Sequence, residues 1–278
     1  MQINTAHNSS EIIESTKREG GLNFKGVKKE SQPHKPLITI ITATFNAAVH
    51  LPHTIKSIRE LTYDNIQWIV VDGASKDSTV ELIQQNDDVI DYWISEPDSG
   101  IYDAWNKGVS LAQGEWIAFV GAGDSYISNA IDIYMDVINA SPTKLDLASS
   151  RVRLVDSYGL EKRVWGAAFN WRLFKSYMTI AHVGALHHKG LFEKFGFFDT
   201  SYTSAGDYEF LMRCGAHLNA IYLDVITSEM LIGGISNGYK GLFETYLIQR
   251  KYGVGFSAKP RFWLSCAKRF IRPLLRGY

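Results

Sequence analysis

Two stretches of the sequence carry residue types that can do chemistry. Asp98–Gly108 combines two aspartates, a tyrosine, an asparagine and two glycines, and Gly114–Asp124 is an apolar run that ends in glycines and one aspartate. Asp124 is thereby predicted to follow a buried strand, at the carboxyl edge of a parallel sheet where ligands collect. Carboxylate oxygens suit Mg²⁺ or Mn²⁺, and such an ion can hold a diphosphate. The pattern favours chemistry on a nucleotide sugar.

The elements that must position these residues alternate between strand and helix from Pro36 onward. Short β-branched runs predict strands, apolar residues three and four apart predict helices, and Ser78-Thr79-Val80-Glu81 predicts a capping box. The predicted strands are Leu37–Thr42, Trp68–Val71, Val89–Ser95 and Glu115–Val120, and the predicted helices include Leu51–Leu61 and Ile101–Ala112. Right-handed crossovers then give an α/β fold, a mostly parallel central sheet with helices on both faces. Asp72, Asp98 and Asp124 share one edge of that sheet.

The second half of the chain is predicted to belong to the same domain, because no linker rich in Pro, Gly and Ser separates the halves. Glu209 and Arg213 lie one turn apart on a predicted helix. The expected segments are helices at Leu191–Phe195 and Asp207–Cys214 and strands at Leu145–Leu154, Ala220–Val225 and Leu231–Gly234. We expect a flexible N-terminal arm over residues 1–35, a catalytic domain over 36–240, and a basic amphipathic helical segment over 241–278.

Composition and charge limit the classes of partner. The 278 residues are 45% hydrophobic, and Lys plus Arg equals Asp plus Glu at 29 each, which argues against a nucleic-acid-binding protein. Residues 245–278 nevertheless contain eight Lys or Arg and no acid. The cysteines, Cys214 and Cys266, predict no disulfide framework, and residues 1–36 lack the apolar core of a secretion signal. We therefore expect a cytoplasmic protein.

Four blocks, in this order, resemble the successive signatures of family 2 glycosyltransferases: Thr39–Asn46, Val70–Thr79, Asp98–Gly108 and Asp124. Ordered blocks are more specific than any single motif. The likeness spans about Pro36 to Ser236 and includes Ala205–Glu209 and Gly233–Ser236. It implies the GT-A fold and is strongest to bacterial enzymes that build exopolysaccharide, O-antigen or colanic-acid-type units on a lipid carrier.

The resemblance also implies roles for individual residues. Asp124 matches the last aspartate of the DXD motif, which binds the divalent cation, and Asp207 matches the general base that deprotonates the acceptor hydroxyl during an inverting displacement. Thr42 and Asp72 match positions that hold the base and ribose of the nucleotide, and Asp98 and Asn106 match positions near the donor.

Two positions depart from the family pattern. Ala122 replaces the first aspartate of the DXD motif, so the cation rests on one protein carboxylate plus phosphates and water, an arrangement that Mg²⁺ accepts. Gly206 replaces the acid that usually precedes the base, which removes a charge that tunes or orients Asp207.

Each of these residues also has a purely structural interpretation. Asp72 and Asp124 each adjoin a glycine and are compatible with turns, and Asp207 is compatible with capping free amides at a helix start. Asp103 and Lys107 lie one helical turn apart, so we interpret them as a surface ion pair.

His182, His187 and His188 do not form a metal site with any spaced carboxylates or cysteines. They are interpreted as structural or acceptor-lining residues, with His182 as the acceptor-side candidate. Trp165 and Trp171 are compatible with sugar stacking and with core packing alike.

The C-terminal stretch Arg261–Tyr278 mixes basic residues with aromatic and aliphatic ones. Such a segment is compatible with binding an anionic membrane surface and equally with packing on the body, and Pro273 interrupts any continuous helix. We expect a peripheral location at the inner face of the cell membrane, where a lipid-linked acceptor lies.

The sequence is thus interpreted as an inverting, metal-dependent glycosyltransferase that moves a sugar from a nucleoside-diphosphate sugar to a glycan or lipid-linked oligosaccharide in surface polysaccharide synthesis. One alternative is a noncatalytic scaffold of polysaccharide assembly, suggested by Ala122 and Gly206. A nucleotidyltransferase is disfavoured, since no Gly-rich phosphate loop with Arg or Lys follows the first strand.

Overall fold

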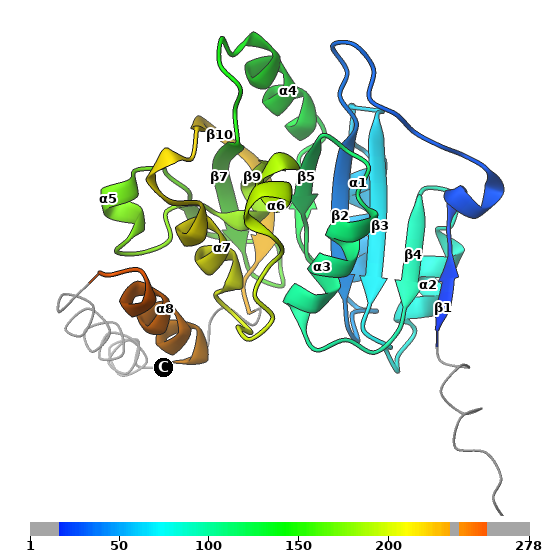
Figure 1. Cartoon of the computed structure of the whole chain (residues 1–278). Helices are drawn as coiled ribbons and strands as arrows, with labels where there is room; N and C mark the ends of the chain where they lie inside the picture. Colours follow the sequence, from blue (N-terminus) through cyan, green and yellow to red (C-terminus); the bar gives the residue numbers. More distant parts are fainter. Residues whose placement is uncertain (1–16, 234–238, 255–278) are drawn as a thin grey trace, which may run out of the picture.

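The computed structural model describes residues 17–233 and 239–254, which form a ten-stranded sheet covered by helices on both faces (Figure 1). The strands are β1 (Arg18–Gly20), β2 (Ile38–Thr44), β3 (Ile66–Asp72), β4 (Tyr92–Ser95), β5 (Trp116–Phe119), β6 (Ser125–Tyr126), β7 (Leu147–Val155), β8 (Glu161–Trp165), β9 (Ala185–His188) and β10 (Ala220–Leu231). Their order is β1-β4-β3-β2-β5-β9-β7-β10-β6, with β8 paired to β7. The α/β class predicted from the sequence is confirmed.

Strands β4, β3, β2 and β5 are neighbours and all run parallel, as predicted for the first half of the chain. The register pairs Thr44 with Asp72 and Asp72 with Ser95. The carboxyl ends of β2, β3 and β4 therefore meet at one edge of the sheet.

The other side of the sheet is mixed rather than mostly parallel. β9 runs antiparallel to both β5 and β7, and β6 runs antiparallel to β10, whereas β7 and β10 are parallel. Short connections such as the β7–β8 hairpin permit antiparallel pairing without a crossover helix. β10 is one long strand with irregular register in place of the two predicted short ones, and Gly234 lies outside the described residues.

The helices divide between the two faces of the sheet. They are α1 (Leu51–Arg59), α2 (Thr79–Gln85), α3 (Ile101–Leu111), α4 (Ala130–Ala140), α5 (Trp171–Phe174), α6 (Gly190–Phe195), α7 (Gly206–Cys214) and α8 (Tyr239–Lys251). Three-residue or four-residue 3₁₀ turns lie at Leu22–Lys25, His182–Gly184 and Gly215–His217. Apolar residues of α1, α2 and α4 share a cluster with one face, and those of α3, α6, α7 and α8 share a cluster with the other.

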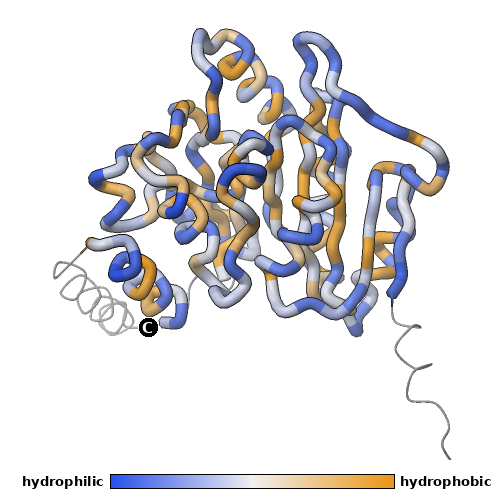
Figure 2. The backbone as a smooth tube through the Cα atoms, viewed as in Figure 1, coloured by the Kyte–Doolittle hydropathy of each residue, from blue (hydrophilic) through white to orange (hydrophobic). Residues whose placement is uncertain are grey.

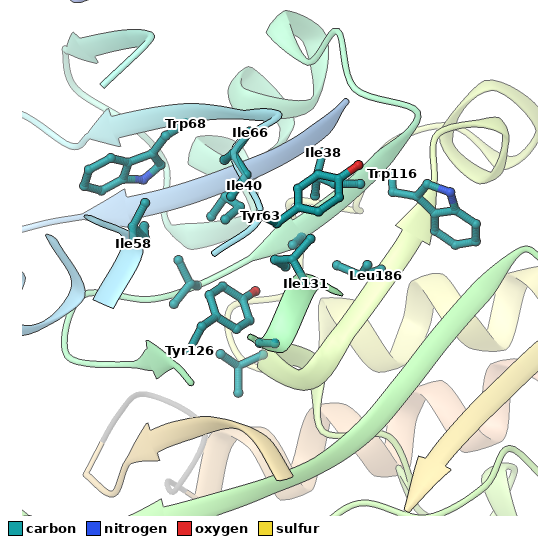
Figure 3. Packing of buried hydrophobic residues seen from close by; sticks show 14 of the residues in the cluster. Ile38, Ile40, Ile58, Tyr63, Ile66, Trp68, Trp116, Tyr126, Ile131 and Leu186 are labelled. Carbon is teal, nitrogen blue, oxygen red and sulfur yellow. The ribbon is translucent and has the colours of Figure 1, made fainter. Parts of the chain in front are cut away.

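Alternation along β2 accounts for these two cores. Ile38 and Ile40 point to the α1 side, where Ile58 and Ile131 pack with them (Figure 3), and Ile41 belongs to the cluster under α3. Hydrophobic residues accordingly concentrate along the strands (Figure 2). Strands buried on both faces explain the unbroken apolar runs of the sequence.

The prediction of a flexible N-terminal arm over residues 1–35 is wrong from residue 17 onward. β1 adds an antiparallel strand to β4, and the Lys29 Nζ donates to the Ile66 carbonyl at 2.6 Å and to Asp91 Oδ2 at 2.8 Å. These polar contacts leave no trace in hydrophobic periodicity, which is why residues 17–35 looked structureless. Residues 1–16 lie outside the described part.

The boundary predicted at residue 240 lies at the start of α8, which begins at Tyr239. α8 packs on the domain through Ile248, which is fully buried, and Gln249 Nε2 donates to the Ser176 carbonyl at 2.7 Å. The predicted membrane-binding stretch Arg261–Tyr278 lies outside the described residues. Within the ranges that the structure does describe, no helix is long and apolar enough to cross a membrane.

Candidate active site

The three aspartates predicted to share a sheet edge each follow a parallel strand. Asp72 is the last residue of β3, Asp98 lies in the loop after β4, and Asp124 lies beyond β5. The parallel register places these strand ends together. This arrangement is the one that the alternation of strands and helices predicted.

Asp72 is fully buried and is held by donors from the ends of β2 and β4 and from the loop after β3. Its carboxylate accepts from Thr44 Oγ1 at 2.9 Å, from Ser95 Oγ at 2.7 Å, and from both the backbone N–H and the hydroxyl of Ser75. All of these contacts are internal. Asp72 therefore ties the strand ends together, and Thr44, Ser75 and Ser95 are partners that the sequence analysis missed.

Two loops at this edge are joined by reciprocal hydrogen bonds. The Asn46 N–H donates to Ser75 Oγ and the Lys76 N–H donates to Asn46 Oδ1, each at 2.8 Å. Asn46 and Ala74 both have left-handed backbone conformations, with φ of 48° and 59°. Asparagine tolerates this region, whereas alanine is strained there, and such strain concentrates at functional sites.

The capping box predicted at Ser78 is not formed. The side chain of Ser78 makes no capping bond, and Asp77 Oδ1 instead accepts from the Thr79 N–H at 3.1 Å and from the Thr79 hydroxyl. Asp77 Oδ2 also accepts from the Ala48 N–H at 3.1 Å. The aspartate reaches both the helix start and the facing loop, so it takes the capping role from Ser78.

Asp98 is half-buried beside the Asp72 loop. Its Oδ1 accepts from the Gly100 N–H at 2.9 Å, and a Cβ on Gly73 would lie only 2.6 Å from its Oδ2. Burial, reinforced by Asp103 and Asp72, raises the pKa of Asp98, while Gly100 and Lys107 oppose the rise. The predicted Asp103–Lys107 pair is present at 3.8 Å, although Lys107 lies closer to Glu96, at 2.8 Å.

Two residues predicted to bind the donor are engaged elsewhere. Thr42 is fully buried within β2, where its hydroxyl accepts from Trp68 Nε1 at 3.0 Å. The Asn106 amide holds the backbone of Phe198, accepting from its N–H and donating to its carbonyl, both at 2.9 Å. Thr42 is thus a core residue, and Asn106 fastens α3 to the chain before α7.

Asp124 lies in a short loop that α1 holds in place. Thr54 Oγ1 donates to the Asp124 carbonyl at 2.7 Å and accepts from the Gly123 N–H at 2.9 Å. On the far side, Asp124 Oδ1 accepts from the Leu231 N–H at 2.9 Å. Burial raises the pKa of Asp124 to about 7, against the lowering effect of the Leu231 and Gly121 backbone.

The oxygen atoms of the Asp124 loop determine whether it can bind a cation. In residues 17–233 and 239–254, no group of three or more His, Cys, Asp or Glu could hold a metal ion. Asp124 supplies one carboxylate, fixed at Oδ1 by Leu231, and Ala122 adds no oxygen ligand from its side chain. These residues fit a hard cation that takes its other ligands from phosphates and water.

Asp207, the predicted base, lies half-buried in the first turn of α7. Its Oδ1 accepts from the Tyr102 hydroxyl of α3 at 3.1 Å and from the Tyr208 N–H at 2.9 Å. Burial raises the pKa of Asp207 to about 6 and the Glu244 charge adds to this, whereas the two donors oppose it. Because the N-cap residue is Ala205 and the Asp207 carboxylate accepts from the adjacent N–H, Asp207 is not the N-cap of α7.

The glycine at position 206 has a steric cause. A Cβ there would lie 2.8 Å from Cε2 of the Tyr102 ring, a distance that real Cβ atoms essentially never show. The tyrosine ring fills the space of a side chain at residue 206. The same ring carries the hydroxyl that donates to Asp207.

Glu209, the neighbouring acid, is a structural residue. It is buried, and it accepts from Arg213 NH2 at 2.9 Å, Lys251 Nζ at 2.9 Å and the Tyr252 hydroxyl at 2.6 Å. The Glu209–Arg213 pair predicted from spacing is confirmed, and the contacts with Lys251 and Tyr252 join α7 to α8.

His182, the predicted acceptor-side residue, is half-buried in an aromatic cluster. Its ring stacks on Trp105 and Phe119 with centroids 4.8 and 5.1 Å apart, and its Nε2 has no hydrogen-bond partner in the described structure. Burial lowers its pKa to about 3, so the ring is neutral. Since Trp105 also contacts Tyr102 edge-on at 5.4 Å, His182 is connected to Asp207 through two aromatic rings.

A mixed α/β sheet whose parallel strand ends gather carboxylates is the architecture of GT-A-type sugar-nucleotide transferases. The model of the family described as "Glycosyl transferase family 2" matches residues 39–196, and the chain belongs to this family. The protein is therefore a glycosyltransferase.

A relative with a glycosyltransferase name resembles the chain in sequence, and solved structures resemble it in fold. A "PGL/p-HBAD biosynthesis glycosyltransferase" of Mycobacterium bovis is 29% identical over 210 residues, which are 73% of this chain and 80% of the relative. S. aureus TarS 1-349 in complex with UDP-GlcNAc has a TM-score of 0.62 at 16% identity, covering 78% of this chain and 66% of TarS 1-349. The mannosyltransferase PcManGT from Pyrobaculum calidifontis, in complex with GDP-Man and Mn²⁺, has a TM-score of 0.56 at 17% identity, covering 81% and 65%.

Replacing Ala74 by glycine is expected to stabilise the protein by about 0.5–1 kcal/mol, because glycine adopts the left-handed conformation without strain. Urea unfolding measures the effect. The matched control is Ala48→Gly on the facing loop, where φ is not positive and the added chain entropy should destabilise. A less stable Ala74→Gly variant would mean that the loop is not strained there.

Asp207→Asn is expected to raise the melting temperature at pH 7.5, and this advantage should shrink as the pH falls to 5. The folded pKa of Asp207, about 6, exceeds the unfolded value of about 3.9, so wild-type stability declines as pH rises through this window. Asparagine keeps the acceptor oxygen without the charge. Asp156→Asn is the control of opposite sign, because Lys162 lowers the pKa of Asp156. A pH-independent difference for Asp207→Asn would contradict the raised pKa.

Proposed function

We propose that this glycosyltransferase transfers a sugar from a nucleoside-diphosphate sugar to a hydroxyl of a glycan acceptor, with inversion at the anomeric carbon. The observation that carries the proposal is the hydrogen bond from Tyr102 to Asp207. Tyr102 lies in the first turn of α3, directly after the loop of Asp98, so it joins a partly buried carboxylate of α7 to the edge where β3 and β4 end. Donor-side and acceptor-side groups are thereby held next to one another.

Asp207 acts as the general base in this proposal. A carboxylate with a pKa of about 6 is largely ionised at neutral pH yet more basic than an exposed aspartate, which suits proton abstraction. The acceptor oxygen gives its proton to Asp207 and forms a bond to the anomeric carbon. The bond from that carbon to the diphosphate breaks on the opposite face, and the nucleoside diphosphate leaves with the electron pair.

Tyr102 and the Tyr208 N–H orient the base. Burial raises the pKa of Tyr102 far above its ordinary value, and the Asp207 charge adds to this, so the hydroxyl remains a donor. With one oxygen of Asp207 fixed by these two donors, the other is available for the acceptor. His182 and Trp105 provide a neutral aromatic surface next to Tyr102, which suits the acceptor side.

Asp124 is the residue that we propose holds Mg²⁺ or Mn²⁺. Such an ion, when bound, neutralises charge on the departing diphosphate. Support comes from the donor set of the Asp124 loop and from the Mn²⁺ named for PcManGT. Asp72 and Asp98 complete the donor side, Asp72 by fixing the loops and Asp98 as a half-buried acceptor of hydrogen bonds.

The donor class is supported by the ligands named for the similar structures, which are UDP-GlcNAc for TarS and GDP-Man for PcManGT. We further propose a lipid-linked acceptor in bacterial surface polysaccharide synthesis and a peripheral position at the inner membrane face. The eight Lys and Arg of residues 245–278, with no acid among them, support attraction to anionic lipid.

The alternative is a noncatalytic scaffold for polysaccharide assembly, which Ala122 and Gly206 suggested. The packing of Tyr102 on Gly206 weakens this alternative. Although the acid is missing at residue 206, the Tyr102 hydroxyl still donates a hydrogen bond to Asp207. Nucleotide release from UDP-GlcNAc or GDP-mannose with Mn²⁺ separates the two, since a scaffold releases none.

Asp124→Asn is expected to abolish the enhancement of donor binding by Mn²⁺ while the fold persists, because asparagine still accepts from the Leu231 N–H. Loss of an outer-shell partner of a metal site already lowers cation affinity by about 10–100-fold. Loss of the ligand itself should lower it by at least as much. Calorimetric titration of UDP-GlcNAc and GDP-mannose, with Mn²⁺ and with EDTA, measures this. Asp136→Asn, at an exposed position on α4, is the control. An unchanged Mn²⁺ effect in Asp124→Asn would exclude Asp124 as the ligand.

Asp207→Asn should lower turnover by about 10²–10⁴-fold with donor affinity preserved, because asparagine accepts hydrogen bonds but no proton. Initial rates of nucleotide release and transfer measure the loss. Glu209→Gln, the neighbouring buried acid, should mainly lower stability. Turnover of Asp207→Asn within about threefold of the wild-type rate, well below the range for a general base, would assign Asp207 a structural role.

A further inference from the structure

Glu244 of α8 holds the backbone that leads into α7. It is buried, with 6% of its surface exposed. Its Oε1 accepts from the Thr203 N–H at 2.9 Å and the Thr203 hydroxyl at 2.8 Å, and its Oε2 accepts from the N–H groups of Ser204 at 2.8 Å and Ala205 at 3.0 Å. One carboxylate thus binds three consecutive amides and a hydroxyl.

These amides lie immediately before the turn that carries Asp207. The residue at the N-cap, Ala205, has no side-chain acceptor, so α7 lacks a local cap. Glu244, about 40 residues further along the chain, accepts from the N–H groups of Ala205 and of the two residues before it, and a negative charge next to a helix N-terminus is favourable. α7 and α8 lie side by side in Figure 1, and Glu209 joins them again one turn further along.

We propose that Glu244 is a positioning residue for Asp207: its carboxylate fixes residues 203–205, and with them the orientation of the Asp207 side chain towards the acceptor. The inference rests on the proposed function of Asp207 as the base. It means that α8, although distant from the sheet edge in sequence, is part of the active site.

Glu244 acts on Asp207 by charge as well as by geometry. Among the residues that the structure describes, the titratable side chains that act on the Asp207 carboxyl are Tyr102 from α3, which donates to it, and Glu244 from α8. Glu244 raises the pKa of Asp207 and Tyr102 lowers it. Loss of the Glu244 charge therefore moves the ionisation of Asp207 to lower pH.

The test compares Glu244→Gln with Glu209→Gln, a second buried carboxylate of the α7–α8 contact. With UDP-GlcNAc or GDP-mannose and Mn²⁺, Glu244→Gln should lower kcat by about 10–100-fold with little change in KM for the donor, since a displaced base loses rate rather than donor binding. The acidic limb of its pH profile should move to lower pH, and that of Glu209→Gln should stay in place. If the acidic limb lies at the same pH in the wild type, Glu244→Gln and Glu209→Gln, the proposal is overturned.

A second measurement needs no substrate. Melting temperatures of the wild type, Glu244→Gln, Asp207→Asn and the double variant form a thermodynamic cycle. The two sites should be coupled at pH 7.5, where Asp207 is largely ionised, and the coupling should shrink at pH 5, where Asp207 is largely protonated. If the effects of the two substitutions on the melting temperature are additive at both pH values, the proposal is overturned. If Asp207→Asn retains full turnover, the assignment of the base fails, and this cycle still decides whether Glu244 acts on Asp207.

Thr203→Val covers the case in which Glu244→Gln does not fold. It removes one donor to Glu244 Oε1 and keeps the carboxylate charge. We expect a lower kcat with an acidic limb at the wild-type pH, because only the positioning contact is weakened. A wild-type kcat in Thr203→Val would contradict the positioning role.

Discussion

The buried carboxylate of Asp72 is the interaction on which the sheet edge depends. It ends β3, and its two oxygens accept from the terminal hydroxyls of the neighbouring strands β2 and β4 and from the amide and hydroxyl of a loop serine. A buried charge is tolerated only when donors surround it, so this carboxylate fixes where Thr44, Ser75 and Ser95 lie. The strained loops that rim the edge are built on this arrangement, and Asp98 packs against the glycine that follows Asp72.

The parallel half of the fold could be predicted because its information is local. Each buried strand is an apolar run of adjacent residues, and each aspartate follows its strand by a few positions. The register then brings Asp72 and the loops of Asp98 and Asp124 to one edge, whatever the details of packing. The same reasoning failed for residues 17–35, which polar contacts hold in place, and for the antiparallel half, where strands far apart in sequence, such as β5 and β9, pair with each other.

For the candidate site, the sequence could predict single residues but not the contacts between residues that lie far apart in the chain. Asp207 was found from its block, but its donor Tyr102 is 105 positions away, and Asn106 fastens Phe198 across 92 positions. No spacing rule connects such pairs. Asn106 and Thr42 were assigned to the sugar donor because they match donor-binding positions of the family blocks, whereas burial and backbone contacts give them structural tasks in this fold.

The contact between Tyr102 and Gly206 has an evolutionary consequence. The ring of Tyr102 occupies the volume of any side chain at residue 206, so residue 206 must stay glycine while the tyrosine is kept. A relative with an acid at the position of Gly206 must carry a smaller or displaced residue at the position of Tyr102. We expect these two positions to covary among homologues, dividing them into lineages whose base is oriented by a phenol and lineages whose base is oriented by a second carboxylate.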